Sequence, residues 1–300
     1  MLPDSRQSEA LLAIVDTGSF EQAAAQLHLT PSAISQRLGA LEAAIGTPLL
    51  IRSRPCRPTA AGQRLVQYLR RSQLLEQEFL AELSNDENRP TSIAVAVNND
   101  TLGTWFLPGL SEFLIRENVL LDIILDDQDH TYTLLEKGLA LAGVSSEPKP
   151  MRGCTAQYLG AMRYRMLATP DFVRRFFPEG FTRDAAKKAP VMNFDRKDSL
   201  QANFIKKELG LSPGAYPVMY VPSSDPFVEA IRLGLGYGML PQQQYKDMIN
   251  TGELVDLAPG KYKDVELYWH SWRVQSPKLE KLSAQVLAAA ARALGANAEI

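Results

Sequence analysis

The stretch that decides the fold runs from residue 18 to residue 59 and is GSFEQAAAQLHLTPSAISQRLGALEAAIGTPLLIRSRPCRPT. Ser19 and Gln22 have the spacing of a capping box, in which each side chain bonds the backbone N–H of the other residue. Thr30 is a favourable N-cap, and Pro31 loses no hydrogen bond at the first helical position. Gly46 suits the left-handed conformation that ends a helix. The stretch therefore predicts two short helices joined by a tight turn, followed by a hairpin.

The second of these helices has two different faces. The apolar residues that recur at helical spacing, and that we expect to be buried, are Ile34, Leu38, Leu41 and Ile45. The opposite face carries the small or hydrogen-bonding residues Ser32, Ser35, Gln36 and Gly39. Such a face fits the floor of the DNA major groove, where base edges present donors and acceptors. The free N–H groups at the start of the helix would suit a phosphate. The alternative is an ordinary amphipathic helix pair with a solvated surface.

Positive charge is concentrated beside this helix pair. Between Thr30 and Arg71 there are seven arginines and a single acid, Glu42. The segment 52–58 would form a wing, a proline-stiffened hairpin tip that reaches phosphates or the minor groove. Bases would be contacted by Ser32, Ser35 and Gln36, and the backbone by the wing arginines. The residues predicted to bind DNA are Thr30, Pro31, Ser32, Ser35, Gln36, Arg37, Arg52, Arg54 and Arg57.

Composition limits the class of protein. The chain has 300 residues, which suggests two or three domains, and a net charge of −2, so any affinity for DNA must come from the local basic region. Its two cysteines, Cys56 and Cys154, provide no disulfide framework. We find neither a secretory signal nor an apolar run long enough to span a bilayer. These features predict a cytoplasmic protein without a membrane partner.

A long helix is expected to follow the hairpin, from Thr59 to about Leu83. Its apolar stripe comprises Leu65, Leu69, Leu75, Phe79 and Leu83, with Ser72 between them. Pairing with the same helix of a second subunit would bury this stripe, and a two-fold dimer suits DNA with two half-sites. The alternative is an ordinary core helix of the same chain. The polar segment 84–91, closed by Pro90, is the predicted linker.

After the linker, short apolar runs alternate with helical stretches. We expect strands at residues 93–97, 120–125, 139–144, 164–168, 191–194, 218–221, 238–240 and 265–272, and helices at 105–116, 131–137, 171–177, 200–209, 226–233 and 279–294. This alternation predicts an α/β fold with a largely parallel sheet. Two such lobes would enclose a cleft, and open α/β sheets bind ligands beyond the carboxyl ends of their strands.

Candidate ligand-binding residues follow the predicted strands. Asn98, Asp100 and Thr101 could hold a carboxylate at a helix start, or could simply cap that helix. The acidic loop with Asp126 and Asp127 would favour a cation, or could be a solvated loop. Further candidates at strand ends are Ser145, Ser223, Ser224 and Asp225. A basic amino acid carries both a carboxylate and a distant cation, and so matches both features.

The pattern from Ala23 to Gly62, with Leu41-Glu42, Gly46 and Thr59-Ala-Ala-Gly62, resembles the N-terminal domain of LysR-type transcriptional regulators. Segments such as Leu159-Gly-Ala-Met-Arg-Tyr164, Val221-Pro-Ser-Ser224 and Tyr268-Trp-His-Ser-Trp272 resemble the branch that regulates arginine and lysine export. Leu139-Ala-Leu141 and Tyr237 depart from the pattern of that branch and leave room for a different effector.

The resemblance implies a winged helix-turn-helix domain at residues 1–59, a dimerisation and linker helix with a hinge at 60–90, and an effector-binding domain at 91–300. That domain would be an α/β fold of two lobes similar to periplasmic binding proteins, with lobe I at about 91–147 and 265–300 and lobe II at about 148–264. The expected partners are an operator in double-stranded DNA, an effector such as lysine or arginine, RNA polymerase, and further copies of the chain in a dimer or tetramer. Target genes would include an amino-acid exporter.

Two other classes of protein share such a scaffold. A solute-binding protein is opposed by the missing signal peptide and by the arginine wing. An enzyme is opposed by the absence of a G-x-S-x-G motif, a P-loop or zinc-ligand spacing, and the Gly234–Gly238 segment lacks dinucleotide-site spacing. The sequence therefore predicts no catalytic residues, no metal and no cofactor.

Overall fold

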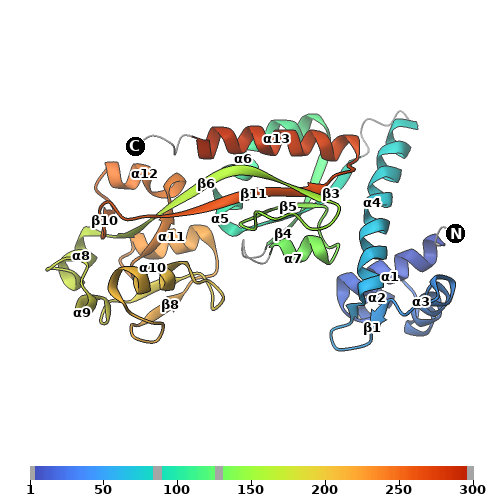
Figure 1. Cartoon of the computed structure of the whole chain (residues 1–300), viewed down its shortest axis with the longest axis horizontal. Helices are drawn as coiled ribbons and strands as arrows, with labels where there is room; N and C mark the ends of the chain where they lie inside the picture. Colours follow the sequence, from blue (N-terminus) through green and yellow to red (C-terminus); the bar gives the residue numbers. More distant parts are fainter. Residues whose placement is uncertain (1–3, 84–89, 126–130, 296–300) are drawn as a thin grey trace.

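The computed structural model describes residues 4–83, 90–125 and 131–295. Figure 1 shows an N-terminal helical part, a long helix beside it and a larger part built around a sheet. The N-terminal elements are α1 (Ser5–Thr17), α2 (Phe20–Gln26), α3 (Pro31–Ile45), β1 (Leu50–Ile51), β2 (Arg57–Pro58) and the long helix α4 (Ala60–Leu83). Strands β1 and β2 pair antiparallel, which confirms the predicted hairpin.

The helix pair begins and ends where its capping residues indicate. Thr30 Oγ1 accepts a hydrogen bond from Ala33 N at 3.2 Å, and Gly46 ends α3 with φ of 81°. Only half of the predicted capping box forms. Ser19 Oγ accepts from Gln22 N, but Ser19 N donates to Thr17 Oγ1 at 3.3 Å instead of to the Gln22 side chain. The hydroxyl of Thr17, the last residue of α1, accepts the hydrogen bond from Ser19 N, so this N–H is not available to the Gln22 side chain.

The buried stripe of α3 is shorter than predicted. Ile34, Leu38 and Leu41 are fully buried against α1 and α2. Ile45 is 42% exposed, so its predicted burial is wrong. As the last residue of α3, it lies beyond the core that the first three turns share with the other helices.

Gly62 allows the start of α4 to pack against the hairpin. A Cβ at this position would lie 2.0 Å from the carbonyl oxygen of Leu49. We expect Gly62→Ala to lower the free energy of unfolding of the N-terminal part by about 1–3 kcal/mol, because strand or helix must move. Gly39→Ala is the matched control, since a Cβ at this position of α3 meets nothing within 4 Å. Thermal unfolding followed by circular dichroism should show a lower Tm only for Gly62→Ala, and equal Tm values for both would contradict this account.

The larger part comprises β3 (Thr91–Val97), α5 (Asn99–Thr101), the π-helical turn η1 (Leu102–Phe106), α6 (Leu107–Arg116), β4 (Val119–Leu125), α7 (Thr131–Glu136), β5 (Ala142–Ser145), β6 (Cys154–Ala168), α8 (Pro170–Phe176), α9 (Arg183–Ala186), β7 (Val191–Asn193), α10 (Leu200–Leu209), β8 (Val218–Tyr220), α11 (Ser224–Arg232), β9 (Gly238–Pro241), α12 (Gln242–Asn250), β10 (Val255–Asp256), β11 (Lys263–Trp272) and α13 (Pro277–Leu294). The predicted strand–helix alternation is present, but α9, α12 and β10 were not predicted.

The main sheet is mixed, so the prediction of a largely parallel sheet is wrong. Its strand order is β10-β6-β11-β5-β3-β4, with β9 also paired to β6. Only the pairs β3–β4 and β3–β5 are parallel. Strands β6 and β11 pair antiparallel along most of their length. The last strand of the chain returns beside the strand that leaves the first lobe, and this return reverses its direction.

These two long strands connect the lobes. At one end β11 pairs with β5, and at the other end β6 pairs with β9 and β10. Figure 1 shows β6 and β11 side by side along the larger part, with α13 over one face of the sheet and α7 on the other. A second parallel pair, β7–β8, lies at the far lobe. The largest core cluster runs through both lobes and includes Phe106, Met162, Tyr164 and Trp269.

Helix α4 is shared between the two parts of the molecule. Val66 and Leu69 join the core of the N-terminal helices, whereas Leu74 joins the core of the larger part. The carboxylate of Glu78, 5% exposed, accepts hydrogen bonds from Ser276 Oγ and from Lys278 N at the start of α13. A negative charge is favourable at a helix N-terminus. Glu78 therefore fixes α4 to the larger part.

Candidate effector cleft and nucleic-acid interface

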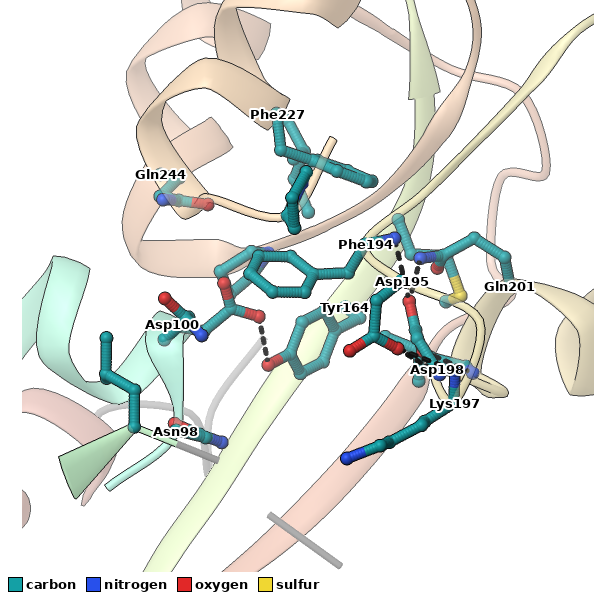
Figure 2. Close-up of a pocket in the computed structure, with 17 residues that line it drawn as sticks. Asn98, Asp100, Tyr164, Phe194, Asp195, Lys197, Asp198, Gln201, Phe227 and Gln244 are labelled. Atoms are coloured by element: carbon teal, nitrogen blue, oxygen red, sulfur yellow. Dashed lines mark hydrogen bonds between the residues drawn. The ribbon is translucent and has the colours of Figure 1, made fainter. Parts of the chain in front are cut away.

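A cavity of about 400 Å³ lies where elements of the two lobes meet. Its wall combines the loop after β3, the end of β4, the middle of β6, the loop after β7 and the start of α12 (Figure 2). This volume is within the range of small-molecule sites. The lining residues are Asn98, Asn99, Asp100, Leu125, Tyr164, Phe194, Asp195, Lys197, Asp198, Leu200, Gln201, Pro222, Phe227, Met239, Leu240, Pro241 and Gln244.

Asp100 connects the two sides of this cleft. Its Oδ2 accepts a hydrogen bond from Tyr164 OH at 2.8 Å, and its Oδ1 accepts from Ser224 Oγ at 2.9 Å. Ser224 Oγ in turn accepts from Gln244 Nε2 at 2.9 Å. Asp100 belongs to the first lobe and Ser224 to α11 of the second. The hydrogen bond between them holds the lobes together at the cleft.

The loop after β7 contributes two aspartates with different tasks. Asp198 is structural, because its carboxylate accepts from Leu200 N at 2.8 Å and from Gln201 Nε2 at 2.9 Å. Asp195 uses only Oδ1, which accepts from the backbone N–H groups of Lys197 and Asp198, so its Oδ2 has no partner in the described part of the chain. In Figure 2 the ring of Tyr164 lies between Asp195 and Asp100.

Gln201 adds a second unpaired acceptor. It is 2% exposed, and its Oε1 has no hydrogen-bond partner among the described residues. A buried carbonyl oxygen without a partner costs free energy that a bound donor would recover. With Asp100 and Asp195, it gives the cavity an excess of acceptors that suits a ligand with several N–H donors.

The predicted ligand-binding residues lie at different distances from this cavity. Asn98 and Asp100 line it, and Asn98 also caps α5 through a 2.8 Å bond from Thr101 N. Thr101 is fully buried, with its hydroxyl 4.0 Å from Met162 Sδ, and does not line the cavity.

The remaining predicted ligand-binding residues do not line the cavity or lie outside the described residues. Ser145 is buried and accepts from Glu147 N. Ser224 does not line the cavity but is hydrogen-bonded to Asp100 and Gln244, which do. Ser223 and Asp225 are exposed and do not line the cavity. Asp126 and Asp127 lie outside the described residues.

Sequence reasoning missed the segment from Phe194 to Gln201. A usable signal was present, because residues 191–194 were predicted as a strand and the charged run Asp195-Arg-Lys-Asp198 follows at its carboxyl end. The rule that directed attention to the ends of other strands applies here equally. Tyr164, Phe227 and Gln244 carried no comparable local signal.

The surface predicted to bind DNA is exposed. Ser32 and Gln36 point to solvent, and Ser35 and Arg37 are half-buried, while Thr30 and Pro31 are exposed at the start of α3. Arg52, Arg54 and Arg57 on the hairpin are also exposed and have no ion pair among the described residues. The hairpin tip (residues 52–56), the segment 17–22 at the start of α2, and Pro31 and Ser35 of α3 line a groove of about 740 Å³.

One acid borders this groove. Glu21 lines it beside Ser19, and a hydrogen bond from the Ser19 hydroxyl is the main cause that lowers the pKa of Glu21. Arg52 lies over the ring of Phe20, 5.7 Å from its centre. The charge of Arg54 also lowers the pKa of Glu21. The groove lining therefore combines small polar side chains with two arginines and one acid, an excess of positive charge that suits contact with a polyanion.

The described ranges contain no sign of a metal site or of a membrane-spanning helix. They contain no group of three or more His, Cys, Asp or Glu side chains that could hold a metal ion. None of the helices in these ranges combines the length and the apolar character that crossing a bilayer requires.

Comparison with known proteins agrees with this architecture. Residues 5–63 match the family described as "Bacterial regulatory helix-turn-helix protein, lysR family", and residues 88–291 match the "LysR substrate binding domain". The HTH-type transcriptional regulator ArgP of Aeromonas salmonicida is 39% identical over 286 residues, which are 95% of this chain and 96% of the relative.

Two solved structures are similar over nearly the whole chain. ArgP from Mycobacterium tuberculosis has a TM-score of 0.81 and 40% identity, covering 97% of this chain and 98% of the other. Full-length LysG from Corynebacterium glutamicum with bound effector Arg has a TM-score of 0.77 and 37% identity, covering 97% and 99%. The relatives are regulators and not enzymes. The chain belongs to the LysR family of bacterial regulatory helix-turn-helix proteins.

Proposed function

We propose that this regulator binds a basic amino acid, arginine or lysine, in the cleft between its lobes and contacts DNA through α3 and the arginine hairpin. The observation that supports this choice of ligand is a set of acceptors around one cavity. Asp195 Oδ2 and Gln201 Oε1 have no hydrogen-bond partner among the described residues, and the carboxylate of Asp100 lines the same cavity. The LysG relative is described with arginine as its bound effector. The same class of ligand fits the charges of this cleft.

The shape of the cleft supports a flat cationic group. Phe194, Tyr164 and Phe227 line the cavity. A guanidinium stacks on aromatic faces and donates hydrogen bonds in its plane, so it can contact ring and carboxylate at once. Lys197 is exposed and adds one positive charge to the lining of the cavity.

Calorimetry on the full chain tests this proposal. We expect saturable binding of arginine or lysine, and at least about tenfold weaker binding of citrulline, which has nearly the shape of arginine without its charge. Glutamate is the control of opposite charge. If neither basic amino acid binds, or if citrulline binds as tightly as arginine, the cleft does not select a cation.

Substitutions on the DNA surface should separate base contacts from backbone contacts. We expect Ser35→Ala with Gln36→Ala to change the base preference in selection from random duplexes, because α3 would face base edges. Arg52→Ala with Arg54→Ala should weaken binding to all duplexes and reduce the salt slope by about 2, from two lost phosphate contacts. Arg175→Ala, an exposed arginine of α8, is the control. An unchanged base preference would remove α3 as the recognition helix.

Assembly and location complete the proposal. We propose that α4 pairs two subunits, that dimers pair into tetramers, and that the regulator acts in the cytoplasm, where it meets operator DNA and RNA polymerase. Ligand binding would shift the assembly only as far as the ligand prefers one arrangement over the other. The exposed apolar side chains of α4 support the dimer.

A further inference from the structure

A further groove lies between α4 and the larger part of the molecule. Its volume is about 740 Å³, and it is distinct from the effector cleft. Arg64 and Arg71 reach it from α4, and Arg152 and Arg273 from the ends of the connecting strands. Figure 1 shows α4 beside this end of β11. Four arginines from three separate segments therefore surround one space.

The strand pairing brings two of these arginines together. Cys154 and Trp272 are partners in the β6–β11 ladder, and Arg273 N donates to Gly153 O at 3.0 Å just beyond it. Arg152 and Arg273 therefore lie next to each other, just before the start of β6 and just after the end of β11. Burial raises the pKa of the Cys154 thiol to about 12, and the positive charges of Arg71 and Arg273 oppose this rise.

Arg71 is held in position from α4. Its guanidinium carbon lies 4.2 Å from the centre of the Trp272 ring, and its Nε donates to Gln67 O at 3.2 Å. These contacts use the face and one N–H of the group. The terminal N–H groups make no hydrogen bond among the described residues and remain available to an acceptor.

The lining of this groove has an excess of positive charge, with four arginines and one acid. In the part of the chain that the structure describes, none of its four arginines forms an ion pair. Among the described residues that line it, the one acid is Glu136, whose backbone oxygen accepts a hydrogen bond from Gln67 Nε2. Like charges that converge without a counter-charge repel one another, and a bound anion would relieve this repulsion.

We propose that this arginine groove is a second binding site, for an anion that carries phosphate. A single carboxylate accepts one guanidinium fork, whereas phosphate groups offer more oxygens and more charge, enough for several arginines. Two sources share this chemistry: a free phosphorylated small molecule and the backbone of DNA that extends past the helix-turn-helix. Because the groove joins α4 to the connecting strands, its occupant would contact both parts of the regulator.

The test compares two double variants of the full chain. Arg152→Gln with Arg273→Gln removes two groove arginines that lie outside the DNA surface. Arg175→Gln with Arg292→Gln removes two exposed arginines elsewhere and changes the net charge equally. Circular dichroism would establish that both variants fold. Pyrophosphate is titrated calorimetrically at ionic strength held constant with potassium chloride, and binding to a long and a short duplex is measured across a salt series.

A free anion is indicated if pyrophosphate binds saturably to the wild type and to the control, and if its affinity for the groove variant is lower by a factor of about ten or more. DNA is indicated if pyrophosphate does not bind but the groove variant reduces the salt slope by about 2 on the long duplex alone. Equal behaviour of the two variants in both measurements would overturn the proposal. None of these outcomes depends on whether the effector cleft binds arginine.

Discussion

Replacing Asp100 by asparagine should weaken arginine binding by about 100-fold, because it removes a negative charge from the cleft and retains the shape of the side chain. The hydroxyls of Tyr164 and Ser224, which now donate to the carboxylate, can turn to meet the amide, so the fold should persist. Calorimetry with arginine on the wild type and on Asp100→Asn measures the effect directly.

A matched variant separates charge from lobe closure. Ser224→Ala removes the 2.9 Å bond between the lobes but leaves the carboxylate of Asp100 in place. If Asp100 acts on the ligand by its charge, Ser224→Ala should weaken arginine binding by about tenfold at most. If the two variants lose affinity equally, Asp100 serves to close the cleft, and its assignment to the ligand fails.

The N-terminal part was largely predictable because local signals specify it. Thr30, Pro31 and Gly46 fix the ends of α3 through hydrogen bonds and backbone angles that involve only neighbouring residues. The hairpin follows within a few residues. Ile45 shows the limit of this approach, since helical spacing gives the face of a residue but not where the neighbouring helices end.

The sheet was harder, because its pairing joins residues distant in sequence. β6 extends from Cys154 to Ala168, but the sequence predicted a strand only at residues 164–168, because buried and exposed positions alternate poorly along its first half. A local pattern does not state the direction of a partner strand more than a hundred residues away. The prediction of a parallel sheet failed for this reason.

Among the residues of the cleft, too, some could be predicted from neighbouring sequence and others depend on contacts between distant segments. Asn98 and Asp100 were found because they follow a strand, a rule that works from the sequence alone. Tyr164 lies inside a strand and reaches the cavity only because β6 crosses between the lobes. The bond from Ser224 to Asp100 spans 124 positions and depends on how the lobes meet.

Replacing Phe79 by aspartate should dissociate the dimer that α4 is proposed to form. Leu75, Phe79 and Leu83 are 49%, 60% and 70% exposed on α4, although the helix is otherwise packed against both parts of the chain. In a two-fold interface each subunit buries its own Phe79. The loss therefore counts twice, at about 3–6 kcal/mol in total, which weakens the dimer about 100- to 20,000-fold.

Sedimentation of the full chain over a range of concentrations measures this effect, and Leu233→Asp is the matched control. Leu233 is 65% exposed at the end of α11, so the same change of an apolar side chain to a charge is made away from α4. We expect the control to sediment like the wild type. Phe79→Asp should sediment as a monomer and lose the affinity that two half-sites provide. If Phe79→Asp retains the mass of the wild type at all concentrations, the subunits associate through another surface, and the exposed stripe of α4 needs a different explanation.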